Sequence, residues 1–396
     1  MAGVILPRAA WRHRPGLDVL ADALGAGDGD ARYVGGAVRD TLLGLDVADI
    51  DIATRHAPAD VVDRLTRTGI RAIPTGIAHG TVTAISAGTV VEVTTLRQDV
   101  ETDGRHATVA FTDDWRADAA RRDFTINALY ADPLTGAVFD YFGGLDDLAE
   151  RRVRFIGNPY RRITEDHLRI LRFFRFHARF GDVLDQPGLD ACTDRANDLM
   201  ALSRERVAAE LLKLLVARNA VPVVALMIER GIFRPVLPEI TDAAALAALA
   251  AREQAAGVAP DPIRRLATLI PPADAEAVGA RLRLSNADRK RLVAASAGAG
   301  DEGARALAYR HGTTQAIDRL LVADASLDDI AEWTPPRLPI GGGEIVARGV
   351  ARGPDVARVL RDVESQWIAE GFPDADRVGA IADAVTTQLV RAASNA

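Results

Sequence analysis

The first 150 residues alternate short apolar runs with short amphipathic segments. Ala31–Val34 has the pattern of a buried strand that ends at Gly35-Gly36, and Ala37–Leu43 after it has helical spacing. Ile50–Ala53 predicts a second strand, and Pro58–Thr68 predicts a helix with proline in its first turn. This alternation indicates a sheet accompanied by helices.

Two β-branched runs follow, Thr81–Ser86 and Thr89–Leu96, and Ala87-Gly88 between them predicts a hairpin. Beyond residue 151 the pattern becomes helical. Helices are expected over Thr164–Phe180 and over Ser203–Val216, the second with its serine as N-cap. The chain is therefore expected to be an α+β protein, with a mixed sheet first and an all-helical remainder after it.

Proline and glycine clusters divide the helical part. The segment from Thr334 to Gly343 contains two successive prolines and three successive glycines, which break the helical pattern. We expect four parts, with boundaries near 157, 215 and 335. They are a head (1–157), a neck (158–215), a body (216–334) and a tail (335–396).

Composition limits the class of protein. With 396 residues, 48% hydrophobic and 26% charged, the chain has the composition of a globular protein with several compact units. No apolar run reaches the roughly 20 residues that a membrane span needs, and the single cysteine excludes an internal disulfide. Met1–Gly16 has arginines and no acid, as transit peptides do, but it lacks a continuous apolar core, so we expect a cytoplasmic protein.

Positive charge is concentrated in one segment. The net charge is −7, yet Arg151–Arg179 contains nine arginines against two acids, a net +7, so the other residues carry −14. A basic segment in an acidic protein favours a localised site for a polyanion. An exposed, arginine-rich helix face is the alternative.

The strongest chemical signal is Gly35–Asp40 followed by Asp49-Ile50-Asp51. Residues two apart on a strand point to the same face, so the two aspartates can chelate one cation together, and hard oxygen ligands suit Mg²⁺. Paired glycines before a helix let the backbone approach a phosphate, with Gly36 at the helix start and Arg39 opposing the charge. Glu92 could supply a third carboxylate or be a plain strand residue.

These residues resemble motif A of class II tRNA nucleotidyltransferases and bacterial poly(A) polymerases. Further similarities follow in the order of that family along nearly the whole chain. They are His79–Thr81 and Glu92–Arg97 in the head, Arg121–Ala128 (motif B), Asp140, Gly144 and Asp147-Leu148 (motif C), Arg162–Arg169 (motif D) and Leu202–Arg206 in the neck. The resemblance implies a polymerase beta-like nucleotidyltransferase head followed by helical neck, body and tail, the tail binding tRNA.

The resemblance also implies roles for individual residues. Asp49 and Asp51 would hold the catalytic Mg²⁺ ions that activate an RNA 3′-hydroxyl and stabilise the leaving pyrophosphate. Arg39 and one or both of Arg121 and Arg122 would neutralise the triphosphate. The ribose would be held by Asp123 and Asn127.

Motif D can also be interpreted from physical chemistry. On a helix, Arg169 and Arg172 share a face, flanked by Asp166 and Arg175. Cytosine and adenine both present an amino donor beside a ring-nitrogen acceptor, so Asp166 can accept from the amino group while Arg169 donates to the nitrogen. Uracil and guanine would leave groups unpaired, at about 1–3 kcal/mol each. An exposed Asp166–Arg169 ion pair is the alternative.

The sequence therefore predicts an enzyme that adds CCA to tRNA 3′ ends from CTP and ATP. Arg97–Asp114 resembles the flexible loop that family members need for adding the terminal A. A poly(A) polymerase or an A-adding enzyme is the nearest alternative, and a non-catalytic RNA-binding relative or a nucleotide transfer to a small molecule such as an antibiotic is more distant. Neither a membrane nor a protein partner is indicated.

Overall fold

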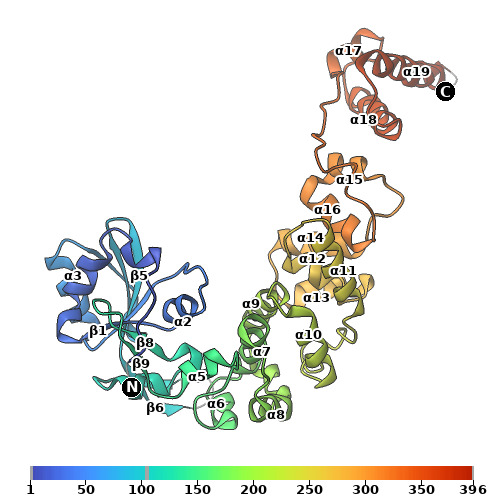
Figure 1. Cartoon of the computed structure of the whole chain (residues 1–396). Helices are drawn as coiled ribbons and strands as arrows, with labels where there is room; N and C mark the ends of the chain where they lie inside the picture. The colour runs from blue at the N-terminus through green and yellow to red at the C-terminus, as the bar shows by residue number, and fades with distance from the viewer. Residues whose placement is uncertain (1–2, 103–106, 395–396) are drawn as a thin grey trace. The chain divides into compact units, whose positions relative to one another are not determined.

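The computed structural model describes residues 3–102 and 107–394. The chain divides into two compact units, Met1–Thr241 and Asp242–Ala396. The first combines a sheet with helices, and the second contains helices (Figure 1). The expected α+β fold is confirmed, whereas the finer division into head, neck, body and tail stays a prediction.

Among the described residues, the sheet of the first unit has seven strands in the order β3-β4-β5-β2-β1-β8-β9. The pair formed by β2 and β5 is parallel and the other neighbouring pairs are antiparallel, so the sheet is mixed as expected. The strands are β1 (Ala31–Val34), β2 (Asp51–Thr54), β3 (Arg71–Gly76), β4 (Thr81–Ser86), β5 (Thr89–Thr95), β8 (Leu129–Ala131) and β9 (Val138–Asp140).

Helices α1 (Leu17–Ala23) and α3 (Pro58–Arg67) pack on one face of the β3–β4–β5 part of the sheet. Along β4 the side chains alternate, because Val82 and Ala84 are buried against that face whereas Thr83 is only partly buried. The hairpin turn at Ala87-Gly88 forms as predicted, with both residues at positive φ. The opposite face of these strands therefore remains accessible at Thr83 and at its cross-strand partner Glu92.

A two-stranded ribbon lies in Arg97–Asp114, the segment that resembles the flexible loop of the family. Strands β6 (Arg97–Thr102) and β7 (Ala107–Phe111) pair in antiparallel fashion, and residues 103–106 lie outside the described residues. The sequence analysis did not predict these two strands, because a backbone ladder needs no apolar alternation in the sequence. Three short helices complete this region: α2 (Gly36–Leu42), α4 (Trp115–Ala120) and α5 (Gly144–Ala149).

The helix expected over 164–180 is two helices with a break between them. Asp166 has extended backbone angles, and its Oδ1 accepts a hydrogen bond from the Leu168 amide at 3.1 Å. This side-chain bond competes with helix continuation, which explains the error. The helices of this part are α6 (Pro159–Glu165), α7 (Arg169–Phe180), α8 (Gln186–Asp194), α9 (Arg204–Leu215) and α10 (Ala220–Glu229). Ser203 caps α9 as predicted, by accepting from the Arg206 amide.

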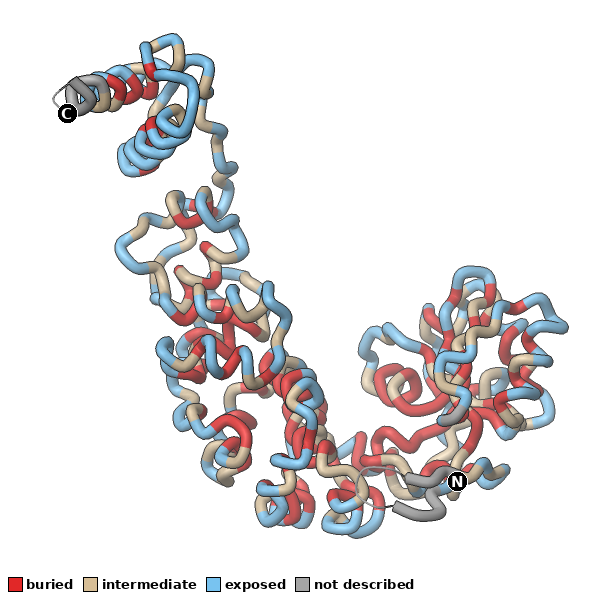
Figure 2. The backbone as a smooth tube through the Cα atoms, turned by 180° about the vertical axis from the view of Figure 1, so that it is seen from behind, coloured by how far each residue is buried: buried red, intermediate tan, exposed pale blue. Residues whose placement is uncertain are grey.

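The second unit is built from helices whose buried and exposed stretches alternate (Figure 2). They are α11 (Ala244–Ala255), α12 (Pro262–Ala267), α13 (Ala275–Arg281), α14 (Asn286–Ser296), α15 (Ala304–His311), α16 (Thr313–Val322), α17 (Gly342–Ala347), α18 (Pro354–Ala369) and α19 (Ala375–Ser394). Residues 323–341 between α16 and α17 form no helix or strand, which includes most of the predicted break. Among the described residues, no helix combines the length and apolar character that crossing a membrane requires.

Candidate active site

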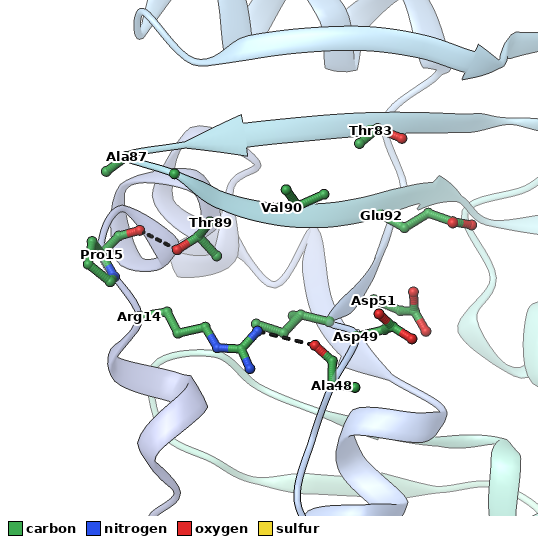
Figure 3. Close-up of a pocket in the computed structure, with 12 residues that line it drawn as sticks. Arg14, Pro15, Ala48, Asp49, Asp51, Thr83, Ala87, Thr89, Val90 and Glu92 are labelled. Atoms are coloured by element: carbon green, nitrogen blue, oxygen red, sulfur yellow. Dashed lines mark hydrogen bonds between the residues drawn. The ribbon is translucent and has the colours of Figure 1, made fainter. Parts of the chain in front are cut away.

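Asp51 is the first residue of β2 and Asp49 lies two residues before it, and the side chains of both lie on the same side of the sheet as Glu92 of β5 (Figure 3). In the parallel pairing of β2 with β5, Asp51 stands opposite Glu92, and the Glu92 amide donates to the Ile50 carbonyl at 3.0 Å. Within residues 3–102 and 107–394, no group of three or more His, Cys, Asp or Glu side chains is placed to hold a metal ion. The geometry thus brings the expected pair together without making Glu92 a third ligand.

The environment of Asp51 disfavours a second negative charge. Burial raises its pKa from 3.8 to about 6, the carboxylate of Glu92 adds to this effect, the guanidinium of Arg122 opposes it, and Asp49 adds a smaller contribution. A divalent cation between the two aspartates would reverse this penalty, because an opposite charge favours the ionised form. The donor set, carboxylate oxygens at the N-terminal end of the central strand β2, therefore fits a hard divalent ion.

Gly35, between β1 and α2, and Arg39, in α2, line the site beside the aspartates. Gly35 has φ +69°, and a side chain there would be strained and would bring its Cβ to 3.4 Å from the Arg122 guanidinium. Arg39 is 6% exposed, donates to Asp40 at 2.7 Å and to Asn127 Oδ1 at 2.5 Å, and lies over the Phe180 ring at 4.1 Å. Its guanidinium is consequently fixed in one orientation at the pocket wall.

Arg121 and Arg122 are held by a buried carboxylate that the sequence analysis did not select. Asp118 in α4 is 1% exposed and accepts from Arg121 Nε at 3.0 Å, Arg122 Nη2 at 3.1 Å and the Tyr130 hydroxyl at 2.6 Å. Burial works against ionisation, but the charges of Arg122 and Arg121 and these bonds hold the pKa of Asp118 below its ordinary value. Its spacing, three and four residues before the arginines on a helix, was a signal that could have identified it.

Asp123 connects motif B to α7. It accepts from Arg172 at 2.5 and 2.7 Å, from Asn127 Nδ2 at 3.0 Å and from the Phe124 amide at 2.8 Å. Burial again works against ionisation, but the charge of Arg172 and these bonds lower the pKa of Asp123. Both expected ribose-binding side chains are thus engaged within the protein, so they form a rigid part of the pocket wall.

Asp166 and Arg169, the two residues expected to read the base, line one pocket but do not form an ion pair with each other. Asp166 forms an ion pair with Arg206 at 2.9 Å, and Arg169 forms one with Glu165 at 2.6 Å. The alternative of an Asp166–Arg169 ion pair is therefore not what the structure contains. Arg175 is held by Glu210 at 2.5 Å. The three partners are Glu165 of α6 and Arg206 and Glu210 of α9. The sequence analysis did not assign them to the site.

One pocket of about 620 Å³ in the first unit, the nucleotide pocket, gathers the candidate catalytic and nucleotide-binding residues that the sequence analysis selected, apart from Glu92. Its lining includes six arginines and four aspartates, an excess of positive charge that suits a polyphosphate. The lining residues are Gly35, Gly36, Arg39, Asp49, Asp51, Arg121, Arg122, Asp123, Asn127, Asp166, Arg169, Arg172, Arg175 and Phe176. Phe173 is fully buried, whereas Phe176, which is 6% exposed, also lines this pocket.

Two family models match the chain. Residues 31–154 match the "Poly A polymerase head domain", and residues 185–244 match the "Probable RNA and SrmB- binding site of polymerase A". The first range contains both aspartates and motif B. The second begins after α7 and contains α9 and α10.

Curated relatives match this chain over most of their length or over about half of it. "CCA tRNA nucleotidyltransferase 1, mitochondrial" of Danio rerio is 36% identical over 382 residues, which cover 89% of this chain and 86% of that protein. The Homo sapiens protein of the same name is 33% identical, with 90% and 87% covered. The "CCA-adding enzyme" of Oceanobacillus iheyensis is 44% identical over 184 residues, 46% of this chain and 45% of that relative.

Solved structures share the fold. The Bacillus stearothermophilus CCA-adding enzyme in complex with CTP has a TM-score of 0.68 at 25% identity, covering 96% of this chain and 100% of that one. The Thermotoga maritima CCA-adding enzyme complexed with tRNA has a TM-score of 0.68 at 19% identity, covering 94% and 95%. Both alignments therefore include the sheet and the helical remainder of this chain.

Proposed function

The chain belongs to the CCA tRNA nucleotidyltransferase family, and on that basis we propose that the nucleotide pocket is the site where it transfers CMP and AMP. The protein is an enzyme that adds CCA to tRNA 3′ ends from CTP and ATP without a template, releasing pyrophosphate. The observation that carries the assignment of the site is the meeting of both aspartates with six arginines in one pocket of about 620 Å³.

Members of this enzyme class depend on a divalent metal, and we propose Mg²⁺ held by Asp49 and Asp51. When bound, Mg²⁺ would supply Lewis-acid stabilisation of the attacking and leaving oxygens. The raised pKa of Asp51 and the carboxylate-only donor set support this assignment. Glu92, opposite Asp51 on the neighbouring strand, would add negative potential without being required as a ligand.

The triphosphate would lie against Arg39, Arg121 and Arg122. Asp118 orients the two arginines of motif B, and Asn127 and Phe180 orient Arg39. Because these guanidinium groups are already held in place, little side-chain entropy is lost when the nucleotide binds. Asp123 and Asn127 would form the wall beside the ribose, with Arg172 maintaining the position of Asp123.

Base choice would come from Asp166 and Arg169. A carboxylate can accept about four hydrogen bonds, and Arg206 uses both Asp166 oxygens through one Nη2 atom, at 2.9 and 3.1 Å. Asp166 therefore retains acceptor capacity for the amino group of C or A. Arg169, held by Glu165 and by the backbone carbonyls of motif B and α6, would present its guanidinium to the ring nitrogen.

A poly(A) polymerase is the second candidate, because the matching head model is named for that activity. The two more distant alternatives account for fewer of the features of the chain. A non-catalytic RNA-binding relative gives no reason for both aspartates to be present, and a transferase for small molecules does not account for the basic segment or the helical remainder.

The test is incorporation into tRNA that ends at the discriminator base, with each NTP singly and with CTP plus ATP. Addition of C, C and A and then a stop supports the proposal, whereas long A tails on generic RNA with ATP alone favour the poly(A) polymerase. The cytoplasmic location is also a proposal, since relatives named as mitochondrial match along most of this chain. Cell fractionation tests it.

A further inference from the structure

The segment of residues 10–16 precedes the part of the chain that matches the head model, which begins at residue 31. It is nonetheless attached to the first unit at several points. Trp11 is 5% exposed, and its Nε1 donates to Thr41 Oγ1 in α2 at 2.8 Å. The segment is thereby attached to the helix that follows the paired glycines.

A second attachment joins the same segment to the turn between β4 and β5. The Thr89 hydroxyl donates to the Pro15 carbonyl at 2.7 Å (Figure 3). Gly16 has φ +75°, and a Cβ there would lie 2.9 Å from the Ser86 carbonyl oxygen, so a side chain would not fit. Arg14, directly before these residues, thus extends from a backbone that is held on both sides.

Arg14 joins this segment to the loop that carries Asp49. Its Nη2 donates to the Val47 carbonyl at 2.9 Å, and its Nη1 donates to the Ala48 carbonyl at 3.2 Å (Figure 3). In the described part of the chain, its guanidinium bonds these two carbonyls and pairs with no carboxylate. Because one planar group holds two successive carbonyls, it fixes the direction of the backbone as the chain reaches Asp49.

The loop, residues 43–50 between α2 and β2, has few other bonds near Asp49. Its first three amides donate to carbonyls of α2, and the Ile50 carbonyl accepts from β5 at 3.0 Å. Between these two ends, and among the described residues, the backbone of 46–49 makes no hydrogen bond except those from Arg14. The position of Asp49 therefore depends on Arg14 as well as on the sheet.

We propose that Arg14 is a positioning residue for Asp49, which it keeps beside Asp51 for the divalent ion. Asp51 is fixed as the first residue of β2, whereas Asp49 lies two residues before that strand. A ligand that is already held in place loses less freedom when the metal binds, and residues that hold metal ligands typically contribute roughly 10- to 100-fold to metal affinity. The inference rests on the proposed function, which assigns the metal to these two aspartates.

The test measures binding of Mg²⁺ alone to the full chain by isothermal titration calorimetry. Arg14→Ala should weaken the affinity for Mg²⁺ about tenfold. The direction is informative, because removing a positive charge near two carboxylates would by itself strengthen the binding of a cation. Arg12→Ala is the matched control and should leave the affinity unchanged, since Arg12 belongs to the same segment but donates to the carbonyls of Leu6 and Pro133, neither of which is in the loop.

Two further measurements separate positioning from a general structural defect. In Arg14→Ala, raised Mg²⁺ should restore the rate of CMP addition toward the wild-type rate, because the loop can still reach the binding conformation. Adding Arg14→Ala to Asp49→Asn should weaken Mg²⁺ binding no further, since Arg14 acts through Asp49. The inference would be overturned by unchanged or tighter Mg²⁺ binding in Arg14→Ala, an equal loss in Arg12→Ala, a rate that raised Mg²⁺ does not restore, or additive losses in the double variant.

The single variant Asp49→Asn separates this inference from the proposed function. If it binds Mg²⁺ as tightly as the wild type does, the assignment of the metal to the two aspartates fails. If it binds Mg²⁺ more weakly and Arg14→Ala does not, only the role of Arg14 fails.

Discussion

Asp118 accepts hydrogen bonds from Arg122 through one carboxylate oxygen, at 3.1 Å from Nη2 and 3.3 Å from Nε. The other oxygen accepts from Arg121 and from the Arg97 amide, the first residue of the β6–β7 ribbon. One buried carboxylate thus positions two arginines of the nucleotide pocket and the base of the ribbon. Asp118 does not line the pocket itself, which makes it a positioning residue.

Replacing Asp118 should separate binding of the nucleotide from binding of the RNA. Asp118→Asn keeps the shape but loses the charge, so Arg121 and Arg122 should lose their fixed orientation. We expect the KM for CTP to rise about tenfold or more while the KM for tRNA stays near the wild-type value, the loss of a charge-assisted hydrogen bond being worth about 1.5–3 kcal/mol. Asp118→Glu should recover part of the loss, and equal changes in both KM values would indicate a general structural defect instead.

The raised pKa of Asp51 gives a prediction for stability without metal. Since its folded pKa of about 6 exceeds the ordinary 3.8, the folded state binds more protons between these values, and the free energy of unfolding should fall as pH rises from about 4 to 6. The loss is at most about 3 kcal/mol. Denaturant titrations in EDTA should show this fall in the wild type and a smaller one in Asp51→Asn.

Added Mg²⁺ should restore much of that stability near pH 7, because it binds the ionised pair in the folded state. Two results would contradict the assignment of the metal to this pair. One is an equal effect of Mg²⁺ on Asp51→Asn, and the other is a rise in wild-type stability over the same pH range relative to that variant.

Base choice should depend on Asp166. In Asp166→Ala, the acceptor for the amino group of C and A is lost, so discrimination against UTP should weaken by about 1–3 kcal/mol, or roughly 5- to 150-fold. Competition between CTP and UTP for one tRNA measures this ratio directly. Arg206→Ala is the informative control, since it frees Asp166 of its partner and should preserve the preference for C. Full selectivity in Asp166→Ala would remove this explanation of specificity.

Gly35 should be required for nucleotide binding for two reasons, its backbone conformation and the space that it leaves for Arg122. Gly29, at φ +78° and ψ +17°, is in the left-handed helical region, where alanine should cost about 1 kcal/mol of stability, whereas Gly35, at φ +69° and ψ −121°, lies outside that region and alanine there should cost more. A Cβ at Gly35 also approaches the Arg122 guanidinium, whereas nothing lies within 4 Å of one at Gly29. Gly35→Ala should therefore raise the KM for CTP while Gly29→Ala leaves it unchanged, and thermal melts should show the larger loss of stability in Gly35→Ala.

Local patterns predicted much of the sheet and the composition of the pocket. The β1 strand, the hairpin of β4 and β5, and the paired aspartates depend on alternation and on turn residues close in sequence. The break at Asp166 and the β6–β7 ribbon were not predicted. In the first, one side-chain hydrogen bond outweighs helical periodicity, and in the second the backbone ladder leaves little sequence signal.

The partners of the site residues could not be predicted for a different reason. Asp123 meets Arg172 across 49 positions of sequence, and Arg175 meets Glu210 across 35. Such pairs depend on how α7 packs against motif B and α9, and propensity within a short window carries no information on that packing. The sequence selected the residues that line the pocket but not the residues that hold them there.

The most direct test of the central claim is transfer by Asp49→Asn and Asp51→Asn, measured beside the wild type with labelled CTP and tRNA ending at the discriminator base. The account predicts that the wild type adds CMP in Mg²⁺. Each variant should lose at least about 10³-fold in rate, on the order of 4 kcal/mol, yet bind tRNA with near-normal affinity. Wild-type rates in either variant would contradict the claim that these two carboxylates form the catalytic site.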